Sequence, residues 1–160
     1  MATNGIRFFD GAGNRIVVEY STEVPPVAAA TWTAVDEVRA ISRNPEASPE
    51  SSFSSYESTT EEIKLGLPRN GGWDFGAIFD PESVSQSAVL ALDQSKGERW
   101  WRVTHPKADT TNGVASSFLF QGFVSVASTA YPDSDTADPL MFNWTTRQSA
   151  GGTFTPESAS

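Results

Sequence analysis

The chain has 160 residues, with 20 acidic and 11 basic side chains, a formal net charge of −9 and no cysteine. This length suits one domain that buries a real core. The missing cysteine excludes disulfides and thiolate metal sites. The negative charge argues against a protein that wraps nucleic acid, because such binding depends on Lys and Arg releasing counterions from phosphates.

Two further absences set expectations about location. No apolar run reaches the length of a membrane span, and the first residues carry no apolar signal-peptide core. We therefore expect a protein made in a cytoplasm, with no membrane partner. Hydrophobic residues make up only 38% of the chain, and the abundance of Ser, Thr, Gly and Pro favours short strands joined by turns.

The N-terminal part, residues 1–31, is predicted to form a hairpin and a connector. Ile6–Phe9 and Arg15–Tyr20 are typical of short strands, and the Gly and Asn residues between them suit a hairpin turn. In Trp32–Ile41 the apolar residues recur every three positions. A short helix or a bulged strand would produce that spacing, and the β-branched content favours the strand.

A long polar segment, Ser42–Thr60, is the most informative part of the sequence. It holds seven serines, two prolines and three glutamates. Structureless loops of this length are uncommon inside a compact domain and usually bind a partner or stay disordered, and this one cannot bury enough apolar surface to fold on itself. We expect an arm that reaches a neighbour. Its candidate contact residues are Asn44, Pro45, Glu46, Pro49, Glu50, Phe53 and Tyr56.

Two strands and a helix follow the polar segment. Glu61–Leu67 and Trp73–Phe79 alternate between apolar and polar or small residues, which is typical of strands with one face in a core. The helix is predicted over Pro81–Gln94, with Asp80 as its N-cap and Pro81 in the first position. Lys96 and Gly97 are expected to end it.

Three more strands complete the pattern. They are Arg99–His105, Ser117–Ala127 and Pro139–Arg147. Gly122, inside the longest of them, indicates a bulge or a close approach of another backbone. The segment from Gln148 has little with which to pack in an isolated monomer. The whole pattern predicts a mainly β protein with one helix.

The search for catalytic and metal-binding motifs finds little. His105 is the only histidine, and no nucleophile motif accompanies it, so a loop or surface histidine is the favoured interpretation. The carboxylates of Asp133–Asp138 could bind Ca²⁺. However, they lack the glycine and distal glutamate of an EF-hand loop, and Asp and Ser are common in ordinary turns. We expect no catalytic residue, no metal and no cofactor.

Five tryptophans raise the possibility of a carbohydrate-binding platform. They are Trp32, Trp73, Trp100, Trp101 and Trp144. All lie in predicted strands, so anchoring in a core or an interface is the more economical explanation. Adjacent Trp100 and Trp101 must face opposite sides of a sheet. Both can be buried only if a second layer covers one side and another layer, such as a neighbouring chain, covers the other.

The order of these features resembles the major tail tube proteins of long-tailed, lambda-like siphoviruses. A strand with an aromatic start (TWTAVDEVRAIS) precedes the long polar loop, and EEIKLGL and GGWDFGAIFDP follow it. A single helix (ESVSQSAVLALDQSKG), a basic and aromatic strand (ERWWRVTHP) and two final strands (FLFQGFVSVAS, DPLMFNWTTRQSAG) complete the series. The resemblance covers residues 32–152, which leaves 153–160 as a C-terminal tail.

The resemblance implies two packed antiparallel sheets in a sandwich or barrel-like tail tube fold, flanked by one α-helix. It further implies a structural, non-enzymatic virion protein whose hexameric rings stack into a tube, assembled in the host cytoplasm. The long loop would reach the adjacent ring, and DNA would pass through an acidic channel during ejection. Tape measure protein and tail terminator would be partners.

Within that frame, charged residues on the polar faces of core strands are candidates to face the channel. Strand alternation selects Asp36, Glu62, Lys64 and Asp74. Two other functions remain open from the sequence: a carbohydrate-binding β-sandwich module, and another phage tail component such as a tail terminator.

Overall fold

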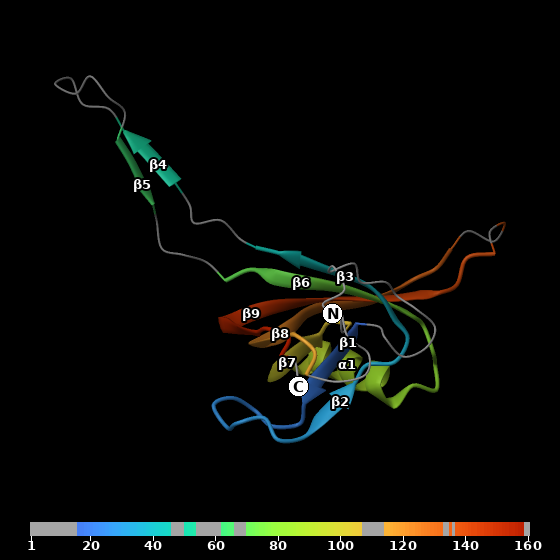
Figure 1. Cartoon of the computed structure of the whole chain (residues 1–160). Helices are drawn as coiled ribbons and strands as arrows, with labels where there is room; N and C mark the ends of the chain where they lie inside the picture. Colours follow the sequence, from blue (N-terminus) through green and yellow to red (C-terminus); the bar gives the residue numbers. More distant parts are fainter. Residues whose placement is uncertain are drawn as a thin grey trace, which may run out of the picture.

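The computed structural model describes residues 16–45, 50–53, 62–65, 70–106, 114–132, 135 and 137–158, and for the short strands within 50–65 it describes the backbone alone. The predicted strand Ile6–Phe9 therefore lies outside the described residues. The elements are β1 (Val17–Ser21), β2 (Trp32–Ala34), β3 (Val38–Asn44), β4 (Glu50–Phe53), β5 (Glu62–Leu65), β6 (Gly72–Ile78), α1 (Val84–Ser95), β7 (Glu98–Thr104), β8 (Ser117–Ala130) and β9 (Met141–Thr155). The mainly β fold with one helix is confirmed (Figure 1).

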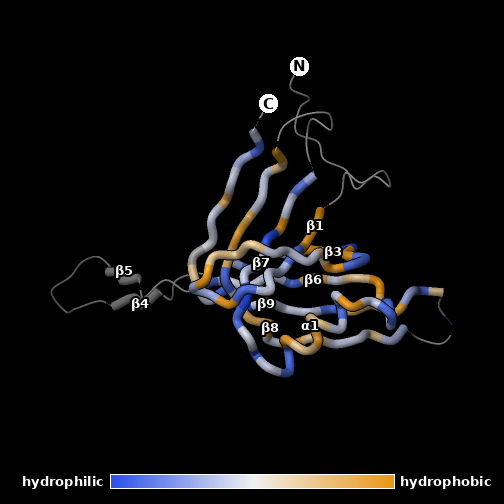
Figure 2. Tube along the Cα trace, turned by 90° about the horizontal axis from the view of Figure 1, so that it is seen from below, coloured by the Kyte–Doolittle hydropathy of each residue, from blue (hydrophilic) through white to orange (hydrophobic). Residues whose placement is uncertain are grey.

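Seven strands form one antiparallel sheet in the order β2-β1-β7-β8-β9-β6-β3, and β4 and β5 form a separate two-stranded ribbon. Burial alternates along β1, β7, β8 and β9, so one face of these strands lies in the core; Figure 2 colours the chain by the hydropathy of each residue. The buried core is rich in aromatic side chains, with Trp101, Trp144 and Phe120 the largest that are fully buried.

The sheet curls until its two halves pack against each other. Strands β6 and β7 are separated by two other strands, a distance of about 14 Å in a flat sheet. Yet the rings of Phe75 and Trp101, from these two strands, have centroids 6.3 Å apart. The predicted pair of packed sheets is therefore the two halves of one hydrogen-bonded sheet.

A three-residue link joins the two outermost strands of this sheet. β2 and β3 are the edges, and only Val35, Asp36 and Glu37 separate them in sequence. The Val35 N–H donates to the Val18 carbonyl at 2.8 Å, and the Glu37 carbonyl accepts from the Ile78 N–H at 3.0 Å. The link thus holds the end of β2 close to the start of β3, and the curled sheet is barrel-like.

This link corrects the prediction of one strand over Trp32–Ile41. The chain leaves β2 after Ala34 and enters β3 at Val38, on the opposite edge of the sheet. Glu37 between them has a positive φ of 56°, a conformation that turns the chain sharply. The spacing of apolar residues in the sequence could not show this break, because the break depends on which strands become neighbours in the sheet.

Helix α1 begins later than predicted. Its N-cap is Ser83, whose side chain accepts from the Gln86 N–H, while the C-cap residue Lys96 is left-handed as the predicted end requires. Asp80 instead accepts from the Glu82 N–H, in the turn before the helix. The helix buries Val89 and Leu92 against the core, whereas Val84 is 81% exposed.

The last strand is longer than predicted. β9 runs to Thr155 rather than ending near Arg147, and it pairs with β8 as far as Ser117 opposite Thr155. The polar composition beyond Gln148 gave no sign of this extension, because main-chain groups make the pairing and the side chains need not be apolar. The predicted irregularity at Gly122 is confirmed by a register shift next to it.

Candidate functional site

Half of the sheet, the strands β8-β9-β6-β3, has two unpaired edges. β3 is the last strand of the sheet, so its outer edge has no partner among the described strands. On the other side, β7 pairs with β8 only as far as Phe123. Beyond that residue, no described strand pairs with this edge of β8. We call these four strands the open half-sheet.

The two edges run in opposite directions. Each neighbouring pair in the open half-sheet is antiparallel. With four strands in alternation, β8 and β3 must therefore point opposite ways. If one copy places its β3 beside the β8 of a rotated second copy, those two strands meet antiparallel, which is the more stable pairing. The open half-sheet is thus complementary to itself.

The outer face of the open half-sheet carries small side chains, most of them polar. The strand register brings them into two rows across the sheet, one of Ser42, Asp74, Thr145 and Val126 and one of Ala40, Gly76, Asn143 and Ser128. We call these eight residues the polar face. They line a shallow depression of about 360 Å³.

Asp74 lies at the centre of the polar face and is held by its neighbours. Its carboxylate accepts from Thr145 Oγ1 at 2.6 Å and from the side-chain amide of Asn44. Gly76 leaves room for Asn143, since a Cβ there would lie 3.0 Å from Asn143 Oδ1. The face is therefore fixed by short polar side chains rather than by bulky ones.

The predicted polar arm is a long excursion from the hairpin that β3 and β6 form. Asn44 at the end of β3 pairs with Gly72 at the start of β6, so the chain leaves and re-enters the sheet at one place. Within the excursion, β4 and β5 pair with each other and with no described strand of the sheet. Figure 1 shows this ribbon lying apart from the sheet.

This ribbon corrects the expectation that Ser42–Thr60 lacks structure. Its first residues belong to β3, and Glu50–Phe53 form β4. Of the candidate contact residues, Asn44 and Pro45 lie where the arm leaves the sheet, and Glu50 and Phe53 are the ends of β4. Glu46, Pro49 and Tyr56 lie outside the described residues.

The four candidate channel residues do not lie together. Asp74 is on the polar face, whereas Glu62 and Lys64 belong to β5 of the ribbon. Asp36 lies in the link between the sheet edges, where its Oδ2 accepts from Ser83 Oγ at 2.7 Å and Ser85 Oγ at 2.8 Å. It thereby ties the link to the start of helix α1. Sequence alternation alone could not separate these three locations.

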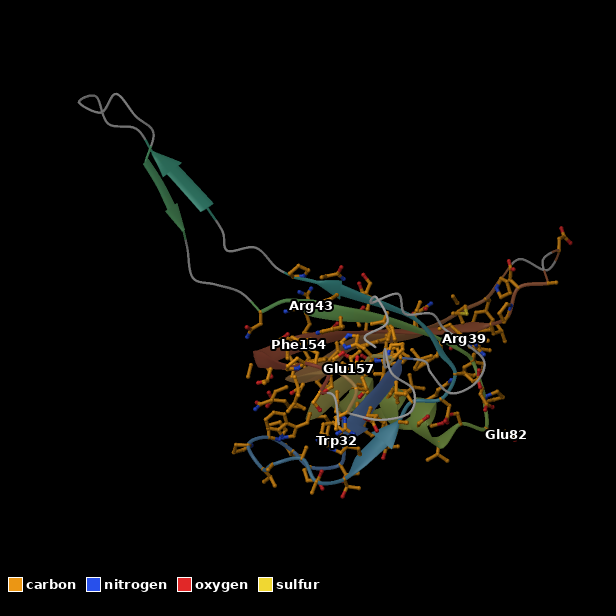
Figure 3. The ribbon with its side chains drawn as sticks, viewed as in Figure 1. Trp32, Arg39, Arg43, Glu82, Phe154 and Glu157 are labelled. Atoms are coloured by element: carbon orange, nitrogen blue, oxygen red, sulfur yellow. The ribbon has the colours of Figure 1, made fainter. Side chains whose placement is uncertain are left out.

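The other half of the sheet has a different outer surface. Glu19 on β1 faces Arg102 on β7, with 2.6 Å between Oε2 and Nη2. The Arg102 guanidinium also stacks on the Trp32 ring at 4.3 Å. Figure 3 shows Trp32 and Arg43, from the two edge strands, on opposite sides of the molecule.

The tryptophans do not form an exposed platform. Trp73, Trp101 and Trp144 are buried in the core, and Arg102 covers Trp32. The indole N–H of Trp100 donates to the Val27 carbonyl at 2.7 Å. The connector of the same chain therefore contacts Trp100, whose side chain is half-buried within the single chain, and its cover by a neighbouring chain stays a prediction.

The remaining motifs offer no evident chemistry. Nδ1 of His105 is 3.3 Å from Ser116 Oγ, but Ser116 is buried and so is closed to a substrate. No group of three or more His, Cys, Asp or Glu residues is placed to hold a metal in the part of the chain that the structure describes. Several residues of the Asp133–Asp138 pattern lie outside that part. No described helix is long and apolar enough to cross a membrane.

Comparison with known proteins identifies the fold through structure alone. No protein-family model matches the sequence, and no curated protein matches it. Among solved structures, a chain of the sheath–tube complex of the PVC extracellular contractile injection system aligns with a TM-score of 0.64 and 8% identity, over 92% of this chain and 93% of that one.

Two further structures come from phage-like particles. The SPP1 tail tube aligns with a TM-score of 0.58 and 7% identity, over 90% of this chain and 78% of that one. A chain from the tail of a gene transfer agent particle, solved with C6 symmetry, aligns with a TM-score of 0.58 and 11% identity, over 91% of this chain and 99% of that one. The chain therefore has the tail tube fold, and the fold expected from the sequence is confirmed.

Proposed function

We propose that the chain is the subunit of a phage-like tail tube, a structural protein whose hexameric rings stack around a channel. The observation that carries this proposal is the open half-sheet, whose two unpaired edges run antiparallel to each other. Unpaired edges of this kind attract other strands and are normally blocked. Closing them around a ring removes them.

The geometry of such a ring allows DNA to pass. Six copies of the open half-sheet would give a barrel of about 24 strands, spaced about 4.8 Å apart and tilted by roughly 40°. The backbone diameter would then be about 48 Å. After subtracting the side chains, the lumen is wider than a DNA duplex. The C6 symmetry belongs to the gene transfer agent tail and supports six as the subunit number.

The polar face is the surface we assign to the lumen. Its side chains are small, and its charged member at the centre is the carboxylate of Asp74. A carboxylate there repels phosphates, which limits adhesion during DNA passage. Replacing Asp74 with Lys should slow DNA ejection from assembled tails, with Glu82→Lys, at an exposed position in the turn before helix α1, as the matched control. Equal ejection rates for the two variants would contradict the assignment.

The ribbon is the segment we assign to contacts between stacked rings. The chain leaves the sheet for the ribbon at the end of β3, the strand that forms one free edge. The candidate contact residues of the ribbon include Glu50 and Phe53. Tape measure protein inside the tube and a tail terminator at its end complete the proposed set of partners. We assign no catalytic residue, metal or cofactor to the protein.

Negative-stain electron microscopy of the concentrated pure protein tests the proposal. Hollow tubes with six-fold end views are the expected result. Single rings that never elongate would instead favour a tail terminator, and a persistent monomer that binds glycans would favour a carbohydrate-binding module. Either of these outcomes would overturn the assignment as a tube subunit.

A further inference from the structure

Lys96 touches the free edge of β8 where that edge begins. Its Nζ donates to the Ser125 carbonyl at 2.7 Å and lies 3.5 Å from the Val124 carbonyl. β7 pairs with β8 only as far as Phe123, so these two carbonyls immediately follow the last paired residue. A neighbouring strand that extended this far would need the same groups as acceptors.

The same residues form a bulge that changes the orientation of β8. The register shifts between Val124 and Val126, opposite Thr146 and Thr145. Before the bulge, the even-numbered residues Phe118 to Val124 are buried, and after it the even-numbered residues Val126 and Ser128 are exposed. Ser125 Oγ also donates to the Thr145 carbonyl at 3.2 Å. The bulge thus marks the start of the open half-sheet along β8.

Lys96 occupies a conformation that lysine does not favour. It is the C-cap of α1 with a φ of 53°, in the left-handed region where glycine carries no steric cost. The following residue is Gly97. A lysine held in a strained backbone position suggests that its side chain has a role. Asp93 lies 2.5 Å from Nζ and orients the ammonium group.

We propose that Lys96 is a register stop, a positioning residue that prevents the β3 strand of a second copy from pairing with β8 before Val126. This inference rests on the proposed pairing of β3 and β8 between copies. Because side chains alternate with a period of two, a slip by two residues keeps every side chain on its own face, so alternation alone does not prevent it. The small side chains of the polar face offer little steric resistance to such a slip. A cation bound to the first two carbonyls limits how far the incoming strand can slide.

Cysteine cross-linking can test the stop directly, because the chain has no native cysteine. Ser128→Cys is combined with Ala40→Cys, Ser42→Cys or Asn44→Cys, all exposed positions facing the same side. Each pair is made in the wild-type background, with Lys96→Gly and with Lys96→Arg. Glycine removes the ammonium group and also relieves the left-handed strain, so folding is not at risk, and arginine keeps a cationic donor.

We expect one dominant intermolecular cross-link in the wild type and the same one with Lys96→Arg. With Lys96→Gly, a second cross-link should rise several-fold, to a cysteine two residues earlier in β3, because the neighbour can now advance toward Val124. If Lys96→Gly keeps the single wild-type cross-link, the register stop is wrong while the edge pairing stands. If tubes form without any of these cross-links, the edge pairing itself is wrong.

Discussion

Replacing residues 46–69 with a four-residue Gly-Ser linker should give a stable protein that forms rings but no tubes. The segment lies between the paired residues Asn44 and Gly72, so a short linker can close the β3–β6 hairpin. The core residues that the structure describes all lie outside it. The change therefore removes the ribbon and leaves the open half-sheet intact.

The size of the stability effect follows from loop closure. The connection between Asn44 and Gly72 becomes about fourfold shorter, which lowers the entropic cost of closing it by about 1.2 kcal/mol. For a domain of this size, that gain corresponds to a rise in melting temperature of roughly 3 °C. Growth into tubes should nevertheless be lost, because the proposed contact between rings has been removed.

Thermal unfolding, light scattering after size-exclusion chromatography and negative-stain microscopy measure these outcomes. A second variant keeps the length of the arm but replaces 46–69 with a Gly-Ser chain of equal length. It should also fail to form tubes, without the gain in stability. Tubes of normal length from either variant would refute the role of the ribbon, and a fall in melting temperature on shortening would refute its independence from the core.

Three other substitutions test the fold that supports the site. Gly122→Ala should destabilise the protein by more than about 2 kcal/mol, since a Cβ would lie 2.5 Å from the Arg147 carbonyl oxygen. Gly97→Ala is the control, because a Cβ there would have its nearest neighbour at 3.3 Å. Equal urea midpoints for the two variants would contradict the reasoning. Asp36→Ala should cost about 1–2 kcal/mol by removing the acceptor for two helix serines, and a wild-type melting temperature would count against this. The Thr31 N–H donates to the Glu23 carboxylate and lowers its pKa below the ordinary 4.5. The stabilisation from this carboxylate is therefore complete above pH 4.5 and is lost as the pH falls through the lowered pKa. Glu23→Gln should be less stable than the wild type at pH 7 and equally stable in acid, and a loss of stability independent of pH would refute the linkage.

Local patterns in the sequence predicted the strands with one buried face. The alternation in Trp73–Phe79 identified β6, and the glycine within the longest apolar strand marked a real close approach. The choice of helix N-cap failed because both Asp80 and Ser83 are good capping residues. Only the contact between Ser83 and Asp36, far away in sequence, distinguishes them.

The candidate site was harder to predict because it depends on strand order. Nothing in Trp32–Ile41 shows that its two ends lie on opposite edges of a sheet. The polar face draws its residues from four strands, and each strand alone shows only alternation. Lys96 was predicted as a helix end, but its contact with β8 depends on the bulge at Ser125. Such features follow from tertiary pairing, which a single sequence does not display.

The position of β9 also determines when the open half-sheet can form. β9 lies inside the open half-sheet, between β8 and β6, yet it follows all the other strands in sequence. During synthesis the β3–β6 hairpin cannot join β8 until β9 has emerged from the ribosome. Contacts that are distant in sequence form slowly. A nascent chain that still lacks β9 therefore cannot present both edges of the open half-sheet in one sheet.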